Sequence, residues 1–161
     1  LAQHQGHFTT GIFGTQYMVE LFPDLVEPNV TRNAYPGFGH MLDKGATTLW
    51  ETWKESDNVY SQNHPMFGSV DAWIVKALLG IRVADDAVGA NKIVVAPIAA
   101  QDVSWTKGEY RTPMGVVSVA WQQDGDRRRL TVNIPEGVTA RVQPQPNGEW
   151  LEIKGGRHTW P

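Results

Sequence analysis

The sequence contains no cysteine, which excludes disulfide bonds and thiol chemistry without fixing the cellular compartment. It has no run of about 18 or more apolar residues, so no segment is expected to span a bilayer. Neither sign of charge dominates, because 14 Lys and Arg residues stand against 17 Asp and Glu residues. The net charge of −3 gives no reason to expect nucleic acid or an anionic membrane as a partner. Hydrophobic residues form 41% of the 161 residues, enough for a packed core in one ordinary or two small domains.

Motifs for several kinds of chemistry are also absent. The sequence has no Gly-rich phosphate loop and no Gly-x-Ser-x-Gly. His4 and His7 are close in sequence, but no nearby acid completes a zinc site, so neither a metal nor a cofactor is predicted. The first residues lack the charged and apolar regions of a signal peptide, and localisation stays open between cytoplasmic, periplasmic and secreted. Residues 6–11 resemble the entry to a helix, with no preceding element to pack against it, so we expect a C-terminal piece of a larger protein.

The first half of the sequence has helical periodicity. Apolar residues recur at three- and four-residue steps after Ile12, and Pro23 is expected to end this helix near Phe22. Thr48, with Glu51 three residues later, has the spacing of a capping box for a turn that restarts after Gly45. The predicted segments are helices over 12–22, 37–54 and 69–79, a loop over 28–36, Ser69 as the N-cap of the third helix and Gly80 as the residue that ends it.

The second half, from Lys92 onward, has the alternation of β-strands. Residues 83–91 lack periodicity and are predicted to connect the two halves. Asp124-Gly125-Asp126 and Pro144–Gly148 have turn residues suited to two hairpins, and the three arginines over 127–129 are expected to be solvated beside the first turn. Several short strands at this spacing predict an antiparallel β-sandwich. The predicted strands cover 93–96, 116–121, 130–134, 140–142 and 150–153.

Glu51 is the carboxylate with the most suggestive neighbours. Trp50 and Trp53 flank it, and indole faces suit the apolar faces of pyranose rings while a carboxylate takes the sugar hydroxyls. An ionised, fixed carboxylate that reaches a water can act as a general base. The same residues also fit a helix with both tryptophans in the core and Glu51 solvated or capping, since Trp is usually buried. From these residues alone, the sugar-site and structural interpretations both stay open.

Asn63 and His64 lie on a predicted loop just before the third helix. A loop imidazole near a carboxylate can orient a water or bind a sugar hydroxyl, although a capping or packing histidine has the same pattern. Asp71 is expected in a first helical turn, where negative charge is stabilised. Asn29-Val30-Thr31 matches an N-glycosylation sequon, which matters only in a secreted eukaryotic protein.

Taken in order, these motifs resemble the C-terminal part of the bacterial α-L-rhamnosidases of glycoside hydrolase family 78. The specific element is Gly-Ala-Thr-Thr-x-Trp-Glu, which occupies residues 45–51. The resemblance covers about residues 6 to 144. Its other pieces are Gly11–Thr15, Tyr35–Gly39, Asn63-His64 with Gly68-Ser69, and, for the family's C-terminal sandwich, Trp105–Gly108, Pro113–Gly115 and Val132–Pro135.

The resemblance implies a fold and a reaction. The fold is the last helices of an (α/α)6 barrel, incomplete over residues 1–82, followed by a C-terminal antiparallel β-sandwich over residues 92–161. The reaction is the inverting hydrolysis of terminal α-L-rhamnosyl residues from rhamnose-containing glycosides or polysaccharides. Glu51 maps onto the family's general base and His64 onto a second active-site residue. Trp50, Trp53 and Asn63 are expected to contact the substrate.

The family's general acid and most of its sugar-binding residues lie upstream of the matched segment. This chain alone is therefore expected to be inactive and to act with the upstream part of the same enzyme. The stretch between Phe22 and Tyr35 is shorter than the family's usual helix-and-loop link. Two other hypotheses stay open: another (α/α)6 glycosidase or lyase that acts on a different sugar, and a non-catalytic carbohydrate-binding β-sandwich module over residues 92–161.

Overall fold

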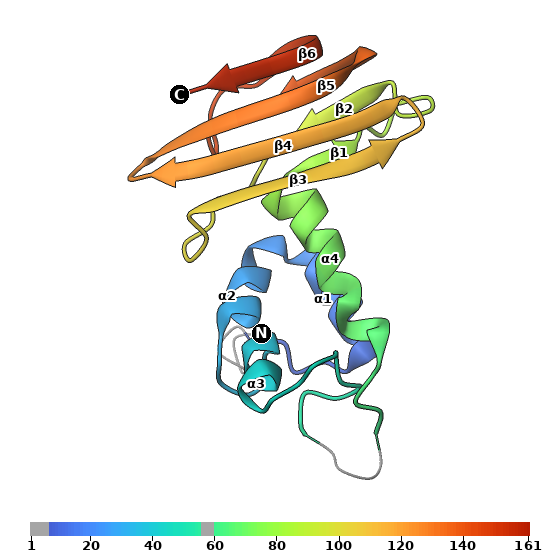
Figure 1. Cartoon of the computed structure of the whole chain (residues 1–161), viewed down its shortest axis with the longest axis vertical. Coiled ribbons are helices and arrows are strands. Elements are labelled where there is room, and N and C mark those ends of the chain that lie inside the picture. The colour runs from blue at the N-terminus through green and yellow to red at the C-terminus, as the bar shows by residue number, and fades with distance from the viewer. Residues whose placement is uncertain (1–6, 56–59) are drawn as a thin grey trace. The chain divides into compact units, whose positions relative to one another are not determined.

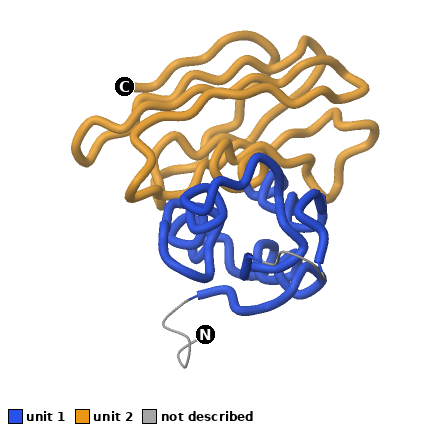
Figure 2. Tube along the Cα trace, turned by 60° about the horizontal axis from the view of Figure 1, so that its bottom comes forward, with its two compact units in different colours: residues 1–73 blue, residues 74–161 orange. Residues whose placement is uncertain are grey.

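A computed structural model describes residues 7–55 and 60–161. Its contacts divide the chain into two compact units, residues 1–73 and residues 74–161 (Figure 2). Helices occupy the earlier part of the chain and strands the later part, which confirms the predicted change from helical to β periodicity. None of the described helices is long and apolar enough to cross a membrane.

Short helices make up the first unit (Figure 1). The predicted end of the first helix before Pro23 is confirmed, whereas the predicted loop over 28–36 is wrong for residues 28–31, which are helical. Pro28 is tolerated there because it lies in the first helical turn, whose N–H groups have no partner within the helix. The bounds are α1 Ile12–Leu21, the 3-10 turn η2 Pro23–Leu25, α2 Val26–Thr31, α3 Phe38–Asp43, the 3-10 turn η3 Pro65–Ser69 and α4 Val70–Trp73.

Asn29, on α2, ties the start of the described chain to this unit. Its side chain is 1% exposed, and its Oδ1 accepts a hydrogen bond from the Phe8 N–H at 2.9 Å. Its Nδ2 donates to the Leu25 carbonyl at 2.6 Å. A glycan could not be attached to a side chain buried in this way, so the sequon at Asn29 is a chance match.

Helix α3 ends in a Schellman motif, which corrects the predicted helix over 37–54. Gly45 has a φ of +84°, a left-handed conformation that favours glycine. The Gly45 N–H donates to the Leu42 carbonyl at 2.8 Å, and the Ala46 N–H donates to the Met41 carbonyl at 2.9 Å. These bonds satisfy the last carbonyls of α3, and no helix restarts before residue 55. The segment that carries Glu51 is therefore irregular rather than helical.

The third predicted helix, over 69–79, is confirmed as a helical run but changes type along its length. After α4, residues Ile74–Leu78 form the π-helical turn η4, and the Leu79 N–H donates to the Ile74 carbonyl at 2.8 Å. Gly80 follows with a φ of +73°, and a Cβ there would lie 2.3 Å from the Ala96 carbonyl carbon. Only glycine fits at that point, as predicted, whereas Ser69 does not cap the helix, since its buried Oγ has no hydrogen-bond partner in the described chain.

The second unit holds one six-stranded sheet in the order β1-β2-β5-β4-β3, with β6 paired to β5 (Figure 1). The β4–β5 and β5–β6 hairpins are confirmed, whereas β1 and β3 were not predicted. The expectation of an antiparallel arrangement is wrong for one pair, because β2 runs parallel to β5. The bounds are β1 Ile81–Val83, β2 Lys92–Val95, β3 Trp105–Thr112, β4 Gly115–Asp124, β5 Arg127–Val142 and β6 Leu151–Trp160.

Strand β5 joins two halves of this sheet. Its first part pairs with β4 through residues 127–133, and its last part pairs with β2 through residues 139–142. Strand β6 pairs with both parts, with a register shift between Ile134 and Thr139. Gly137 in this bulge has a φ of +79°. The sheet therefore has one half made of β3, β4, β5 and β6 and another made of β1, β2, β5 and β6.

Arg128 lies inside the second unit, which corrects the prediction of three solvated arginines. Its side chain is 1% exposed, and its Nη1 and Nη2 donate to the Pro97 and Ile98 carbonyls at 2.8 and 2.5 Å. Its guanidinium carbon lies 4.4 Å from the centroid of the Trp121 ring. Burial lowers the pKa of Arg128 to about 10, so the side chain stays protonated at neutral pH. Alternation along β5 explains the correction, since the core residues Leu130, Val132 and Ile134 share its face.

Candidate functional site

Two irregular segments of the first unit, residues 48–53 and 60–64, are held together by backbone hydrogen bonds. The Glu51 N–H donates to the Ser61 carbonyl at 2.9 Å, and the His64 N–H donates to the Leu49 carbonyl at 2.8 Å. The Thr48 hydroxyl donates to the Gln62 carbonyl instead of capping a helix, so the predicted capping box is wrong. This ladder brings the segment of Glu51 beside the segment of Asn63 and His64.

The Glu51 carboxylate is fixed by its partner segment. The Ser61 N–H donates to Glu51 Oε2 at 2.8 Å, so these two residues exchange two hydrogen bonds. The side chain is half-buried, and within residues 7–55 and 60–161 its other oxygen, Oε1, has no hydrogen-bond partner. A carboxylate held through one oxygen, with the second free to accept from a water, has the arrangement that a general base needs.

Ser61 also fixes the loop that carries Asn63. Its hydroxyl donates to the Asn63 carbonyl at 3.0 Å and accepts from the Asn63 N–H at 3.1 Å. The Asn63 side chain is exposed, so it is free to meet a ligand. Sequence reasoning missed Ser61, because its role depends on a contact between segments ten residues apart and not on a local motif.

His64 is half-buried, and its Nε2 atom is fully enclosed without a hydrogen-bond partner in the described chain. A buried polar atom left unpaired costs about 1–3 kcal/mol, so such an atom needs an explanation. Because protein atoms enclose Nε2, a substrate hydroxyl or an outside side chain would reach it only after neighbouring side chains move.

Trp50 and Trp53 are both 5% exposed. The Trp53 Nε1 donates to the Thr10 carbonyl at 2.8 Å, and its ring centroid lies 4.1 Å from that of Phe67 and 5.1 Å from that of Phe38. Protein atoms therefore cover most of the Trp53 indole, which favours the core interpretation of this residue. The substrate contact expected of both tryptophans stays a prediction.

The described residues offer little for metal binding. No group of three or more His, Asp or Glu side chains in 7–55 and 60–161 could hold a metal ion. His4, part of the weak zinc pair, lies outside the described residues. His7 contacts Arg32 Nη1, and partial burial together with the Arg32 charge lowers the pKa of His7 below its usual value.

Comparisons with known proteins match nearly all of the chain. Residues 1–78 match the family model described as the bacterial α-L-rhamnosidase six-hairpin glycosidase domain. Residues 80–156 match the bacterial α-L-rhamnosidase C-terminal domain. The chain belongs to the bacterial α-L-rhamnosidase family. Glu51, Asn63 and His64 all lie within the six-hairpin match.

Curated relatives of the chain are named α-L-rhamnosidases. One from Streptomyces avermitilis is 29% identical over 149 residues, 84% of this chain and 14% of the relative. One from Alteromonas is 24% identical over 94% of this chain and 19% of the relative. One from Formosa agariphila is 26% identical over 99% of this chain and 18% of the relative. The chain thus spans less than a fifth of each relative's length.

Solved rhamnosidase structures share the fold of the chain. The α-L-rhamnosidase from Dictyoglumus thermophilum superposes with a TM-score of 0.82 and 28% identity, covering 98% of this chain and 21% of that one. The Streptomyces avermitilis enzyme, solved with L-rhamnose, gives a TM-score of 0.84 at 24% identity over 98% of this chain and 18% of that one. At that identity the second likeness establishes the fold alone.

Proposed function

We propose that this chain is the C-terminal part of an inverting α-L-rhamnosidase, in which Glu51 is the general base. The observation that carries the proposal is the Glu51 carboxylate, held at Oε2 by the Ser61 N–H with Oε1 left without a partner in the described residues. It lies inside the six-hairpin domain match. The substrate is a terminal α-L-rhamnosyl residue of a glycoside or polysaccharide, in keeping with the names of the relatives.

In this reaction Glu51 removes a proton from a water as the water attacks the anomeric carbon. A general acid on the opposite side of the sugar protonates the leaving oxygen, and inversion needs about 6.5–9.5 Å between the two carboxyl groups to admit the water. That acid is supplied by the remainder of the enzyme. Residues 1–161 alone are therefore inactive in this proposal.

His64 and Asn63 line the same site beside Glu51. In this proposal the half-buried His64 imidazole hydrogen-bonds a sugar hydroxyl or the attacking water once the side chains that enclose its Nε2 move aside. The exposed Asn63 amide contacts the sugar, as expected from the sequence. Trp53 anchors the Glu51 segment through its contacts with Phe38 and Phe67, and Trp50 is the tryptophan that contacts the sugar in this proposal.

The helices over residues 1–82 complete the end of an (α/α)6 barrel, and residues 92–161 form the C-terminal β-domain, a sandwich whose two layers share β5 and β6. An exposed apolar stripe on α1 supports this assignment. Phe13, Tyr17 and Leu21 recur every four residues and are 72%, 63% and 69% exposed. A stripe of this kind needs a covering element, and preceding barrel helices would supply it.

The test is Glu51→Gln in the full-length enzyme. We expect turnover of an aryl α-L-rhamnoside to fall about 100-fold or more, because the amide cannot accept the water's proton. Glu20→Gln, at an exposed position on α1, is the matched control and should keep full activity. Proton NMR of the first-formed sugar should give the β-anomer. Near wild-type turnover of Glu51→Gln, or a first-formed α-anomer, would refute the assignment.

A panel of aryl glycosides separates this proposal from another glycosidase or lyase. Preference for α-L-rhamnoside over other aryl glycosides supports the rhamnosidase. An unsaturated product would identify a lyase, since elimination leaves a double bond where hydrolysis adds water.

A further inference from the structure

The outer face of the β1-β2-β5-β6 half of the sheet contains a groove of about 670 Å³. The strand register places Arg82, Val94, Arg141 and Glu152 in one row across its four strands. A second row contains Lys92 and Thr139. All residues that line this groove belong to the second unit, whereas Glu51 and His64 belong to the first. Its volume falls within the range of roughly 300–1,000 Å³ that is usual for small-molecule sites.

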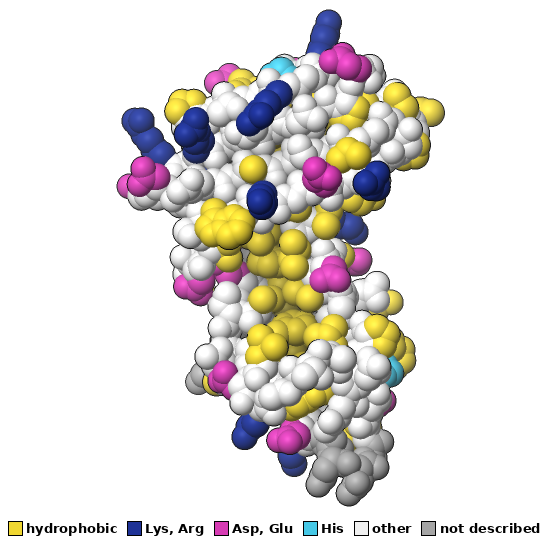
Figure 3. Space-filling view, viewed as in Figure 1, with side chains coloured by type: hydrophobic (Ala, Val, Ile, Leu, Met, Phe, Trp, Pro, Cys, Tyr) yellow, Lys and Arg dark blue, Asp and Glu magenta, His cyan; other side chains and the backbone are white. Residues whose placement is uncertain are grey.

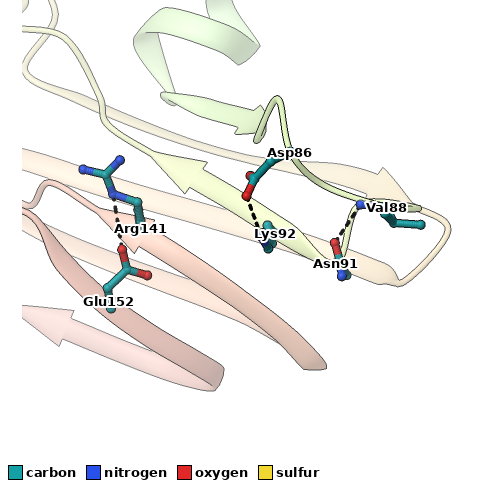
Figure 4. A network of polar contacts seen from close by, with 6 residues as sticks. All are labelled: Asp86, Val88, Asn91, Lys92, Arg141 and Glu152. Atoms are coloured by element: carbon teal, nitrogen blue, oxygen red, sulfur yellow. Dashed lines mark hydrogen bonds and ion pairs between the residues drawn. The ribbon is translucent and has the colours of Figure 1, made fainter.

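The charged side chains of the groove hold one another in place. Lys92 Nζ lies 2.5 Å from Asp86 Oδ2, and Arg141 Nε lies 3.3 Å from Glu152 Oε1 (Figure 4). The loop between β1 and β2 is closed by the Val88 N–H, which donates to Asn91 Oδ1 at 2.8 Å (Figure 4). These side chains remain 46% to 72% exposed, so they are oriented but still open to a ligand.

An aromatic ring adjoins the groove through Arg141. The guanidinium carbon of Arg141 lies 4.7 Å from the centroid of the Trp150 ring. Trp150 is 39% exposed, which is unusual for so large an apolar side chain. A ring that is held by a cation and partly open to solvent can pack against the apolar face of a sugar.

The charge balance of the groove selects the class of ligand. Its lining includes three cations, Arg82, Lys92 and Arg141, and three anions, Asp85, Asp86 and Glu152. Equal numbers of cationic and anionic side chains leave the groove without net charge, which suits an uncharged ligand rich in hydroxyl groups and disfavours nucleic acid or polyanions. Charges of both signs are likewise interspersed on the face of the molecule seen in Figure 3.

We propose that this groove is a non-catalytic binding site for a neutral saccharide chain. Sugar hydroxyls would accept hydrogen bonds from Arg82 and Arg141 and donate to Asp85 and Glu152, while Trp150 packs against a ring face. That the saccharide contains rhamnose rests on the proposed function, whereas saccharide binding by the groove does not depend on it. The site would hold a polymeric substrate while the barrel cleaves a terminal residue.

Amide NMR shifts of the 161-residue chain test the proposal, with a neutral rhamnotriose as the probe. We expect Val94, Thr139 and Arg141 to shift, with a Kd of about 1 mM, as for weak binding by one short groove. Arg82→Ala and Trp150→Ala should each weaken binding about fivefold or more. Lys107→Ala, on the other half of the sheet, is the control and should bind normally. Melting temperatures near that of the parent chain would establish that the variants fold.

Three results would overturn the proposal. The first is the absence of shifts at these amides when the rhamnotriose concentration is about 10-fold above the expected Kd. The second is a loss of binding in Lys107→Ala as large as that in Arg82→Ala and Trp150→Ala. The third is tighter binding of trigalacturonate than of rhamnotriose. Glu51→Gln should leave groove binding unchanged, since that residue is not part of the groove. The groove proposal is thus tested by saccharide binding to the 161-residue chain, whereas the proposed function is tested separately by turnover of the full-length enzyme.

Discussion

Replacing Trp53 tests whether this residue belongs to the core or to the sugar site. Trp53→Ala should reduce the free energy of unfolding of the first unit by about 3–5 kcal/mol, the usual cost of removing a buried large aromatic. The ring is 5% exposed and pairs with Phe38 and Phe67, and each aromatic pair adds about 0.5–1.5 kcal/mol. Trp53→Phe keeps an aromatic ring in place and loses the hydrogen bond to the Thr10 carbonyl, so it should cost only about 1–2 kcal/mol.

Two measurements check this prediction. The first is urea unfolding of the 161-residue chain, followed by circular dichroism at helical wavelengths. The free energy of unfolding should be highest for wild type, lower for Trp53→Phe and lowest for Trp53→Ala. Steady-state kinetics of the full-length Trp53→Phe enzyme should leave KM within about threefold, because a core residue does not touch substrate. A loss below about 1 kcal/mol in Trp53→Ala, or a large rise of KM in Trp53→Phe, would contradict the core assignment.

Three further predictions concern other residues. His64→Ala in the full-length enzyme should lower kcat, by less than Glu51→Gln, and an unchanged kcat would make His64 purely structural. Arg128→Leu should cost about 2 kcal/mol in urea unfolding, because two buried carbonyls lose their donors while the burial of a charge is relieved. The pKa of His7 is lower in the folded chain than in the unfolded chain. His7 therefore makes the free energy of unfolding rise with pH until about 6.5, the ordinary pKa of histidine, and fall as the pH drops below that value. Arg32→Gln should raise the His7 pKa in an NMR titration, and an unchanged titration would refute the influence of Arg32.

The features that the sequence predicted depend on residues close together in the chain. Pro23 ends α1, and Gly80 with its φ of +73° ends the later helical run, because each acts on its own backbone. The Asp124–Asp126 turn fixes the β4–β5 hairpin in the same way. The parallel pairing of β2 with β5 was missed because it joins strands separated by the whole β3–β4 hairpin, which no local pattern records.

The site shows the same division. Glu51 was recognised from a short motif, whereas the Ser61 N–H that holds its carboxylate was not. The helix predicted around Glu51 was wrong because Gly45 ends α3 and the backbone of Leu49 and Glu51 hydrogen-bonds to His64 and Ser61 instead. Alternation of side chains along β5 placed Arg128 inside, although its two arginine neighbours made a solvated run the simpler prediction.

Two features of the first unit support the same proposal without using the family resemblance. The buried His64 Nε2 lacks a polar partner in the described residues, and the stripe of Phe13, Tyr17 and Leu21 lacks an apolar cover. Complete domains generally avoid both conditions, since each costs free energy. The stripe on α1 is what an element packed on this helix would cover. The preceding helices of the proposed barrel would cover the stripe if they pack on α1, which is why we place the other half of the proposed catalytic pair on them.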